Sequence, residues 1–598
     1  MPDNPNSLIN RFQRWKTEHL SHQQFLMILS SIIGFAAGLG AVAIKNLTHF
    51  IQHLMETELI INYHLAFYFL FPLLGLTMVV LIIKYVFKRN IGHGIPSTLH
   101  AISKKKGIMP RMQMYASLIT APITVGFGGS VGLEGPTVAT GASIGSNISR
   151  LFQMNQASRT LLIGCAAAGA MSSIFKAPIA AIVFAIEVFS LDLTLISLLP
   201  LLLASVSAVL TSYFFFGSDT ILPFTLTDEF VITEVPYYIL LGILAALCSI
   251  YFTRMYFRIN RFFKKLASPF KRLLIGGTGL GILIFLIPPL YGEGYDVINS
   301  LLEEDYLNAL GNNYFNAYLD NMWVVIALLG GLVLFKIIAT SLTFNAGGIG
   351  GIFAPVLFMG STMGHCFALL LNYLGLTRDP LSVSNFTLVG MTGLMAGVLH
   401  APLTAIFLIA ELTAGYELFI PLMITAAVSY MITIQFVPHS VYTMELASRG
   451  ELLTHNKDQA VLTLMDIDQV IETNFVSLKV KMTLGEIIQE GVMKSSRNIF
   501  PVVDDDNIFM GVILMDDLRP IMFDKSLYDN IKANEVMQAA PEIIDIQKDS
   551  MKSIMRKFQD SDAWNLPVVR EERYLGFISK SKLLTAYRQK LIEVTGQI

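Results

Sequence analysis

One carboxylate stands in an unusual place in this sequence. Glu134 lies in GGSVGLEGP (128–136), a segment with four glycines and a proline between apolar residues. A charged side chain inside a membrane costs at least about 2.5 kcal/mol, so an intramembrane carboxylate is by default a functional-site hypothesis. Glycine permits sharp turns and proline begins helices. The segment therefore predicts a helix start whose exposed N–H groups and positive dipole end attract an anion beside Glu134.

The same pattern recurs in the second half of the chain. Aligning Pro136 with Pro355 sets GGSVGLEGP against GGIGGIFAP, and a second pair, FKAPIAAIVFAIE and LHAPLTAIFLIAE, aligns Glu187 with Glu411. Repeated membrane proteins often bind substrate where their halves meet, at helices broken by glycine and proline. Backbone amides there suit a small anion, because they replace its hydration without a full positive charge. The alternative is that the glycines only allow close helix packing.

The composition is that of a polytopic membrane protein. Of its 598 residues, 53% are hydrophobic and only 14% are charged. Residues 25–44 hold no charge and are long enough to cross a bilayer, and about ten further apolar runs follow before residue 437. The polar first 20 residues do not resemble a cleaved signal peptide. The three cysteines have unrelated spacings, which predicts neither disulfides nor a metal site.

Charged residues outside the apolar runs indicate the topology. Segment 254–272 carries seven basic residues and no acid, whereas 218–236 carries four acids and no base. Because positive loops stay cytoplasmic, the basic segment and the basic turn 104–111 are assigned to the cytoplasm. The acidic stretch 291–320 falls on the opposite side. We interpret all these runs as topology signals without a ligand.

The last part of the chain reads as a soluble, repeated unit. After about residue 450 charged and apolar residues mix, and strand-length Val/Ile runs alternate with helix-like stretches. The segments FPVVDDDNIFMGVILMDDL (500–518) and LPVVREERYLGFISKSKLL (566–584) share a strand, a polar turn, a glycine and a second strand. This pattern predicts two copies of one small α/β unit. The three aspartates 504–506 fit a solvated turn better than a metal site.

Four signatures now stand in order: GHGIP (92–96), GLEGP (132–136), GIFAP (351–355) and Tyr442 in HSVYTMEL. With the paired tail, they resemble the CLC chloride channels and chloride/proton exchangers that carry tandem CBS domains. The resemblance implies an α-helical polytopic membrane protein with an inverted repeat of tilted and broken helices, followed by a small α/β CBS pair. It also implies a homodimer surrounded by membrane lipid, in the plasma or inner membrane of the cell.

The domain boundaries follow from this resemblance. They are a cytoplasmic N-terminal segment 1–24, a transmembrane domain 25–449 with halves at about 25–216 and 237–442, and a cytoplasmic CBS pair 450–598 with copies at about 461–525 and 530–598.

The resemblance also implies a set of site residues. Glu134 is the gate, because its carboxylate competes with the anion when ionised and leaves when protonated. Backbone amides hold the central anion, and the Tyr442 hydroxyl contacts it from the intracellular side. The implied anion-binding residues are His93, Gly94, Ile95, Ile352, Phe353 and Tyr442. His93 replaces the serine of the family pattern, so the preference for chloride over other anions is open.

Two further departures bear on mechanism. Leu133 stands where a basic residue commonly precedes the gating glutamate. Val188 stands where proton-coupled members usually carry an internal proton-accepting glutamate, and valine cannot titrate. We therefore expect a passive, gated chloride channel, with a chloride/proton antiporter using another internal proton route as the alternative. Glu187 and Glu411 are expected to brace helices rather than carry protons.

The last expectations concern nucleotide binding by the tail and the function classes other than anion transport. Asp517 and Ser579 are candidate adenine-nucleotide contacts, but each copy lacks half of the usual pattern, so a structural role is favoured over nucleotide binding. A CBS-regulated magnesium channel or transporter would need oxygen ligands along the pathway. An intramembrane enzyme would need a nucleophile and base or a metal cluster, and the metal-binding pattern HExxH does not occur. We expect no enzyme activity, no cofactor, no metal and no nucleic-acid partner.

Overall fold

The chain forms two compact units, Met1–Arg449 and Gly450–Ile598. The computed structural model describes the following residues: 18–55, 64–89, 91–92, 94–191, 194–217, 230–310, 318–413, 415–448, 461–462 and 465–595.

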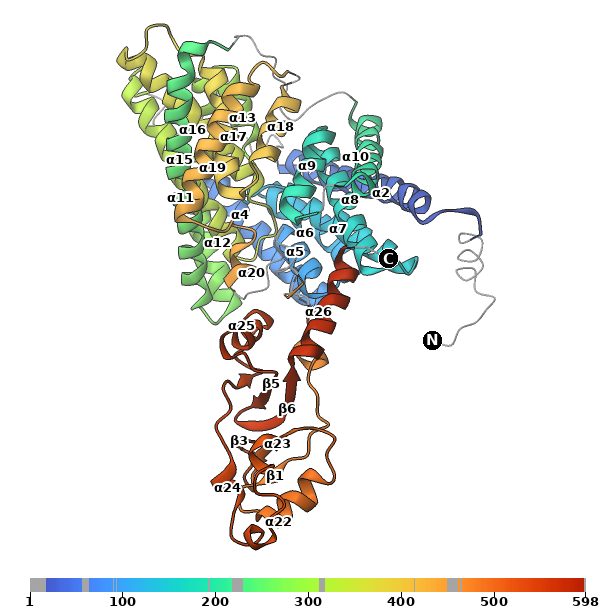
Figure 1. Ribbon diagram of the computed structural model, residues 1–598. Helices are drawn as coiled ribbons and strands as arrows, with labels where there is room; N and C mark the ends of the chain where they lie inside the picture. The colour runs from blue at the N-terminus through green and yellow to red at the C-terminus, as the bar shows by residue number, and fades with distance from the viewer. Residues whose placement is uncertain are drawn as a thin grey trace. The chain divides into compact units, whose positions relative to one another are not determined.

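The first unit is built of helices (Figure 1). Within the described residues, nine helices are long and apolar enough to cross a membrane, and three shorter apolar helices accompany them. Its first part contains α2 (His22–Met55), α4 (His64–Leu81), η1 (Ile82–Phe87), α5 (Gly94–Lys104), α6 (Gln113–Gly126), α7 (Glu134–Leu151), α8 (Gln156–Phe175), α9 (Pro178–Phe189) and α10 (Leu195–Phe216). Its second part contains η2 (Ile232–Glu234), α11 (Val235–Lys264), α12 (Pro269–Leu286), η3 (Pro288–Leu290), α13 (Tyr295–Leu302), α14 (Tyr306–Leu310), α15 (Met322–Asn345), α16 (Phe353–Leu374), α17 (Val383–Leu399), α18 (Pro402–Leu412), α19 (Phe419–Phe436) and α20 (Met444–Ser448).

The sequence repeat is also a structural repeat. The run α6 to α10 corresponds in order to the run α15 to α19, and each run places its glycine-rich loop between its first two helices. In Figure 1, α2, α8 and α10 pack together, and so do α15, α16 and α17. The loops match in detail, because the aligned glycines Gly128 and Gly347 have φ angles of 88° and 104°, a region that glycine enters without strain.

The helices break where the sequence motifs indicate. Lys176 ends α8 with a φ of 56°, and the aligned His400 ends α17 with a φ of 55°. Ala177 and Ala401 follow, and Pro178 and Pro402 then begin the next helices. Proline suits a helix start because its missing N–H would have no partner there. Each half therefore contains a long helix, a tight turn and a short second helix.

The second unit contains two matching three-stranded sheets, β1-β2-β3 and β4-β5-β6. In each sheet a parallel pair precedes an antiparallel hairpin, with Leu478 opposite Val502 in the first and Ile544 opposite Val568 in the second. The elements are η5 (Ile467–Gln469), β1 (Leu478–Lys479), α22 (Leu484–Glu486), η6 (Ile487–Val492), β2 (Ile499–Val503), β3 (Phe509–Leu514), α23 (Met515–Leu518), η7 (Lys525–Leu527), α24 (Ala533–Val536), β4 (Ile544–Asp545), α25 (Met551–Ser561), β5 (Asn565–Arg570), β6 (Arg573–Ser579) and α26 (Lys580–Thr595). The predicted duplication of the tail is confirmed.

Candidate functional site

The two glycine-rich loops meet each other directly. The Gly132 N–H donates to the Gly351 carbonyl at 2.9 Å, and the Gly351 N–H donates to the Gly132 carbonyl at 2.7 Å. This antiparallel bridge joins the corresponding glycines of the two halves. A Cβ on Gly351 would lie 2.7 Å from the Gly135 nitrogen, so only glycine allows the loops this close.

Three helices begin around this bridge. These helices are α5, α7 and α16, and their first residues are Gly94, Glu134 and Phe353. A Cβ on Gly94 would lie 3.1 Å from the Gly135 carbonyl carbon, so α5 starts against the first turn of α7. The first N–H groups of a helix have no partner within it, and the helix dipole adds partial positive charge. The predicted anion-attracting helix ends are therefore present at the junction of the halves.

The Glu134 carboxylate lies among these helix ends. Its side chain is 1% exposed, and the Tyr295 hydroxyl donates to Oε1 at 2.5 Å. The backbone amide of Ala354, in the first turn of α16, faces the carboxylate. The other oxygen, Oε2, has no hydrogen-bond partner among the residues that the structure describes. A buried carboxylate thus occupies a position suited to an anion, with half of its hydrogen-bonding capacity unused.

Tyr442 presents a second unpartnered polar atom. The residue is 5% exposed, and no described residue hydrogen-bonds to its hydroxyl. It lines a cavity of about 240 Å³ together with the side chains of His100, Tyr256 and Glu445. Lys264 lies 3.4 Å from Glu445 at the exposed edge. A buried hydroxyl without a partner costs free energy, which fits a site that receives a polar ligand.

The remaining site residues predicted from the sequence lie at or near helix starts, on the short helix α9, or outside the described residues. Gly94 and Ile95 form the first turn of α5, whereas His93 lies outside the described residues. Ile352 is the residue before α16, and it is buried. Val188 is buried on α9.

Glu187 and Glu411 brace helix ends, as predicted. The Glu187 carboxylate accepts from the Leu403 and Thr404 amides at 3.0 and 2.8 Å, at the start of α18. Glu411 accepts from the amides of Ile179 and Ala180, at the start of α9, at the same two distances. Each half therefore caps a helix of the other half through a carboxylate on a short helix.

Comparison with known protein families identifies the family to which this chain belongs. A family model described as voltage gated chloride channel matches residues 74–433, more than half of the chain, and a CBS domain model matches residues 467–524. The chain belongs to the voltage-gated chloride channel (CLC) family. It is an integral membrane protein of a family that transports chloride, and the fold class predicted from the sequence is confirmed.

Named relatives include both channels and exchangers. A putative chloride channel protein, ClcB-like, of Ralstonia nicotianae is 29% identical over 383 residues, which cover 63% of this chain and 85% of the relative. The H⁺/Cl⁻ exchange transporter ClcA of Vibrio cholerae is 26% identical over 438 residues, covering 71% and 88%. A further H⁺/Cl⁻ exchange transporter, ClcA of Salmonella paratyphi B, is 28% identical over 414 residues. The relatives therefore favour the antiporter alternative over the passive channel that Val188 led us to expect.

Two solved structures share the fold. A slow cyanobacterial Cl⁻/H⁺ antiporter superposes with a TM-score of 0.60 at 22% identity, covering 72% of this chain and 98% of that one. A eukaryotic CLC transporter superposes with a TM-score of 0.54 at 15% identity, covering 96% and 99%. At these identities the likeness concerns the fold alone.

Three residues beside the CLC-type site were missed from the sequence. Glu293, between η3 and α13, accepts the Leu133 N–H at 2.9 Å, and Tyr295 bonds to Glu134. Lys336 on α15 is 0% exposed and donates to the Gly292 carbonyl at 3.1 Å. In the sequence, Glu293 belongs to the acidic stretch 291–320, which indicates topology and not a site. Lys336 could have been identified from the sequence, because it is a lone charged residue in a long apolar run.

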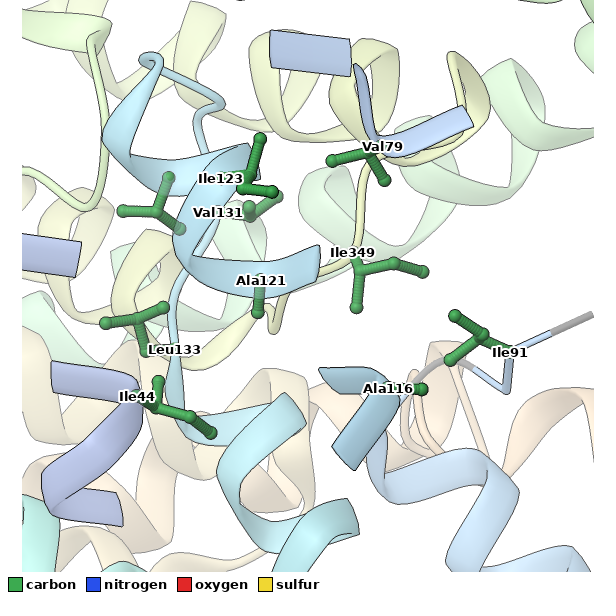
Figure 2. Close-up of a cluster of buried hydrophobic side chains, with 10 residues drawn as sticks. Ile44, Val79, Ile91, Ala116, Ala121, Ile123, Val131, Leu133 and Ile349 are labelled. Carbon is green, nitrogen blue, oxygen red and sulfur yellow. The ribbon is translucent and has the colours of Figure 1, made fainter. Parts of the chain in front are cut away.

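Leu133 stands where a basic residue is common in the family, and it makes apolar contacts instead. It is buried in a cluster with Ile44, Val131 and Ile349, drawn in Figure 2. The cluster joins side chains of both glycine-rich loops to α2. The positive charges near this part of the site come from other elements, since Lys336 and Lys45 both interact electrostatically with Glu293.

In the tail, both candidate nucleotide contacts bind other protein groups. The Asp517 carboxylate accepts from Gln538 Nε2 at 2.8 Å and from the Leu514 N–H at 3.3 Å. The Ser579 hydroxyl donates to Glu472 at 2.5 Å, and Arg497 donates to the same carboxylate at 2.6 Å. Burial raises the pKa of Glu472, but the bonds from Ser579 and Arg497 outweigh it and leave this pKa below its usual value.

Proposed function

We propose that this protein exchanges chloride for protons, with Glu134 as the gating carboxylate. The observation that carries the proposal is the position of Glu134, buried where α7 and α16 begin and facing the Ala354 amide. When ionised, the carboxylate occupies a place that favours negative charge. When protonated, it loses that attraction and yields the place to chloride, so one side chain carries the proton and also controls the access of chloride.

The proposed path of the anion passes the starts of the helices that begin around the glycine bridge. The amides of Ile352 and Phe353 hold the central anion, and the Tyr442 hydroxyl donates to it from the opposite side. Gly94 and Ile95, at the start of α5, contribute the third helix end, and His93 is the proposed anion contact that precedes them in the sequence. Supporting this assignment, Phe353 begins α16, and the buried Tyr442 hydroxyl has no partner within the described residues. Neutral donors bind chloride without trapping it.

The inner proton route needs a titratable group elsewhere, because Val188 cannot titrate. His100 and Glu445 line the same cavity as Tyr442, and they are the candidates for this route. The basic residues at the end of α11 and the start of α12 support the assignment of this side to the cytoplasm. The similarity to the ClcA relatives, which are H⁺/Cl⁻ exchange transporters, supports a coupled mechanism.

A passive chloride channel is the second candidate. The buried, apolar Val188 favours it, because this position on α9 then has no carboxylate to accept a proton. The two candidates differ in one property: an exchanger moves protons against their gradient when chloride flows, and a channel does not. The magnesium alternative loses its basis through the family match.

The remaining assignments extend this proposal. The protein works as a homodimer in the plasma or inner membrane, with the tail in the cytoplasm. The tail serves a structural role rather than nucleotide binding, since Asp517 and Ser579 already have protein partners. No catalytic chemistry and no cofactor enter this account.

The proposal is tested with purified protein in liposomes, following chloride efflux and internal pH together. Glu134→Gln removes the carboxylate that carries the proton while keeping its shape. Chloride efflux should continue and become independent of pH, and coupled proton movement should stop. Glu417→Gln, an exposed glutamate, serves as the control and should behave like the wild type. A Glu134→Gln protein with the wild-type pH profile would refute the gating role.

A further inference from the structure

The internal repeat relates the residue that Glu293 contacts to a residue of the proposed anion site. The alignment that pairs Pro136 with Pro355 also pairs Leu133 with Ile352. Both residues immediately precede a helix, and their φ angles of −87° and −91° match. The Leu133 N–H donates to the Glu293 carboxylate. The start of α7 is therefore already capped by a negative side chain, at the position equivalent to the amide that is proposed to hold chloride on α16.

The groups around Glu293 form a charged network in an otherwise apolar region. Electrostatic interactions link it to Glu134 on α7, Lys45 on α2, Lys336 on α15 and Tyr295 on α13. Lys336 is held rigidly, because it donates to the Gly292 carbonyl at 3.1 Å and lies 4.4 Å from the centre of the Phe358 ring. Glu134 itself also interacts with Tyr442.

The exposure of the two carboxylates differs. Glu134 is buried, whereas Glu293 is half-buried, and Tyr295, which bonds to Glu134, is also half-buried. The unpartnered Oε2 of Glu134 lies inside this arrangement, so the proton that Glu134 accepts arrives in the field of a second acid and a fixed lysine.

We propose that Glu293 is a second carboxylate of the gate, a positioning residue whose charge, opposed by Lys336, sets how readily Glu134 takes up a proton. This inference rests on the proposed gating role of Glu134. Two like charges in a region of low dielectric constant disfavour each other's ionised form, and a nearby lysine does the reverse. Glu293 also fixes the start of α7 through the Leu133 amide.

The signs of the effects follow from Coulomb's law. Glu293→Gln keeps an oxygen that can accept from Leu133 but removes the negative charge, so Glu134 should lose its proton at lower pH. The midpoint of chloride flux against pH should then move to more acid values by roughly one pH unit, as expected when one neighbouring unit charge is removed at an effective dielectric constant of about 20. Lys336→Met should move the midpoint to more alkaline values.

The experiment measures chloride efflux from liposomes between about pH 4 and pH 8, with equal pH on both sides. Glu303→Gln, an exposed glutamate just after α13, is the matched control and should leave the midpoint unchanged. Glu293→Asp keeps the charge and should stay near the wild-type midpoint. These opposite shifts separate an electrostatic role from loss of packing, which has no fixed sign.

The outcomes separate this inference from the proposed function. A Glu293→Gln midpoint equal to that of the wild type, or a shift to alkaline pH, overturns the role of Glu293 even if Glu134→Gln abolishes the pH dependence as expected. If Lys336→Met does not fold, the Glu293→Gln and Glu293→Asp pair still decides. A pH profile that survives Glu134→Gln overturns the proposed gate itself.

Discussion

Gly132 and Gly351 hydrogen-bond to each other in both directions, at 2.9 and 2.7 Å. Because they are aligned residues of the two halves, this bridge lies at the centre of the internal repeat. It fixes the starts of α7 and α16 relative to each other, and these carry Glu134 and Phe353. The site therefore depends on backbone contact between two loops that only glycine permits.

Substituting one of these glycines should damage transport severely. In Gly351→Ala the new methyl group would lie 2.7 Å from the Gly135 nitrogen, so backbone must move, at a typical cost of about 1–3 kcal/mol. Chloride flux per folded protein should fall about tenfold or more. Gly331→Ala on α15 is the matched control, because a Cβ there meets no atom within 4 Å. Equal flux in the two variants would argue against the bridge as the organising contact.

Removing the Tyr442 hydroxyl should weaken anion binding without harming the fold. The hydroxyl is buried and has no hydrogen-bond partner in the described part of the chain, so Tyr442→Phe breaks no hydrogen bond to the described residues. Loss of one hydrogen bond to chloride should cost about 1 kcal/mol, a several-fold weaker affinity in calorimetric titration. Tyr256→Phe, in the same cavity, should bind chloride like the wild type. Unchanged affinity in Tyr442→Phe would place the anion elsewhere.

The bracing glutamates should affect stability rather than coupling. Each of Glu187 and Glu411 accepts two backbone N–H groups at the start of a helix in the other half. Glu187→Gln and Glu411→Gln should each lower the free energy of unfolding by about 1–3 kcal/mol. The ratio of chloride to protons moved should stay constant. A changed ratio in either variant would show that the carboxylate takes part in proton transfer.

How far the sequence predicted this site depends on the kind of contact. The glycine and proline motifs predicted the helix breaks, because those residues act through local backbone geometry. The partner of Glu134 could not be predicted, since Tyr295 lies 161 positions away and reaches it only through the packing of α13. Glu293 was hidden for a similar reason: its role depends on its bond to the Leu133 amide, and a loop acid normally serves topology or solubility. Lys336 was detectable as a lone charge in an apolar run.

The tail offers a pH-dependent prediction. The folded pKa of Glu472 is lowered by bonds from Ser579 and Arg497 despite the opposing effect of burial, so its carboxylate stabilises the fold above the unfolded pKa, about 4.3. That stabilisation is lost as the pH falls through the folded pKa. Hydrogen exchange in β5 and β6 should therefore be slower in the wild type than in Glu472→Gln at pH 6, and the difference should shrink below about pH 4. Glu490→Gln, in an exposed pair with Lys494, should show no such difference.

Proton movement driven by chloride tests the central claim most directly. Liposomes containing the protein are given a tenfold chloride gradient, worth about 1.4 kcal/mol, with no initial pH difference. Coupled exchange through Glu134 predicts that protons move uphill until their gradient opposes further chloride flow, and that Glu134→Ala abolishes this movement. If chloride dissipates while the internal pH stays constant, the exchanger account is wrong and the passive channel favoured by Val188 is correct.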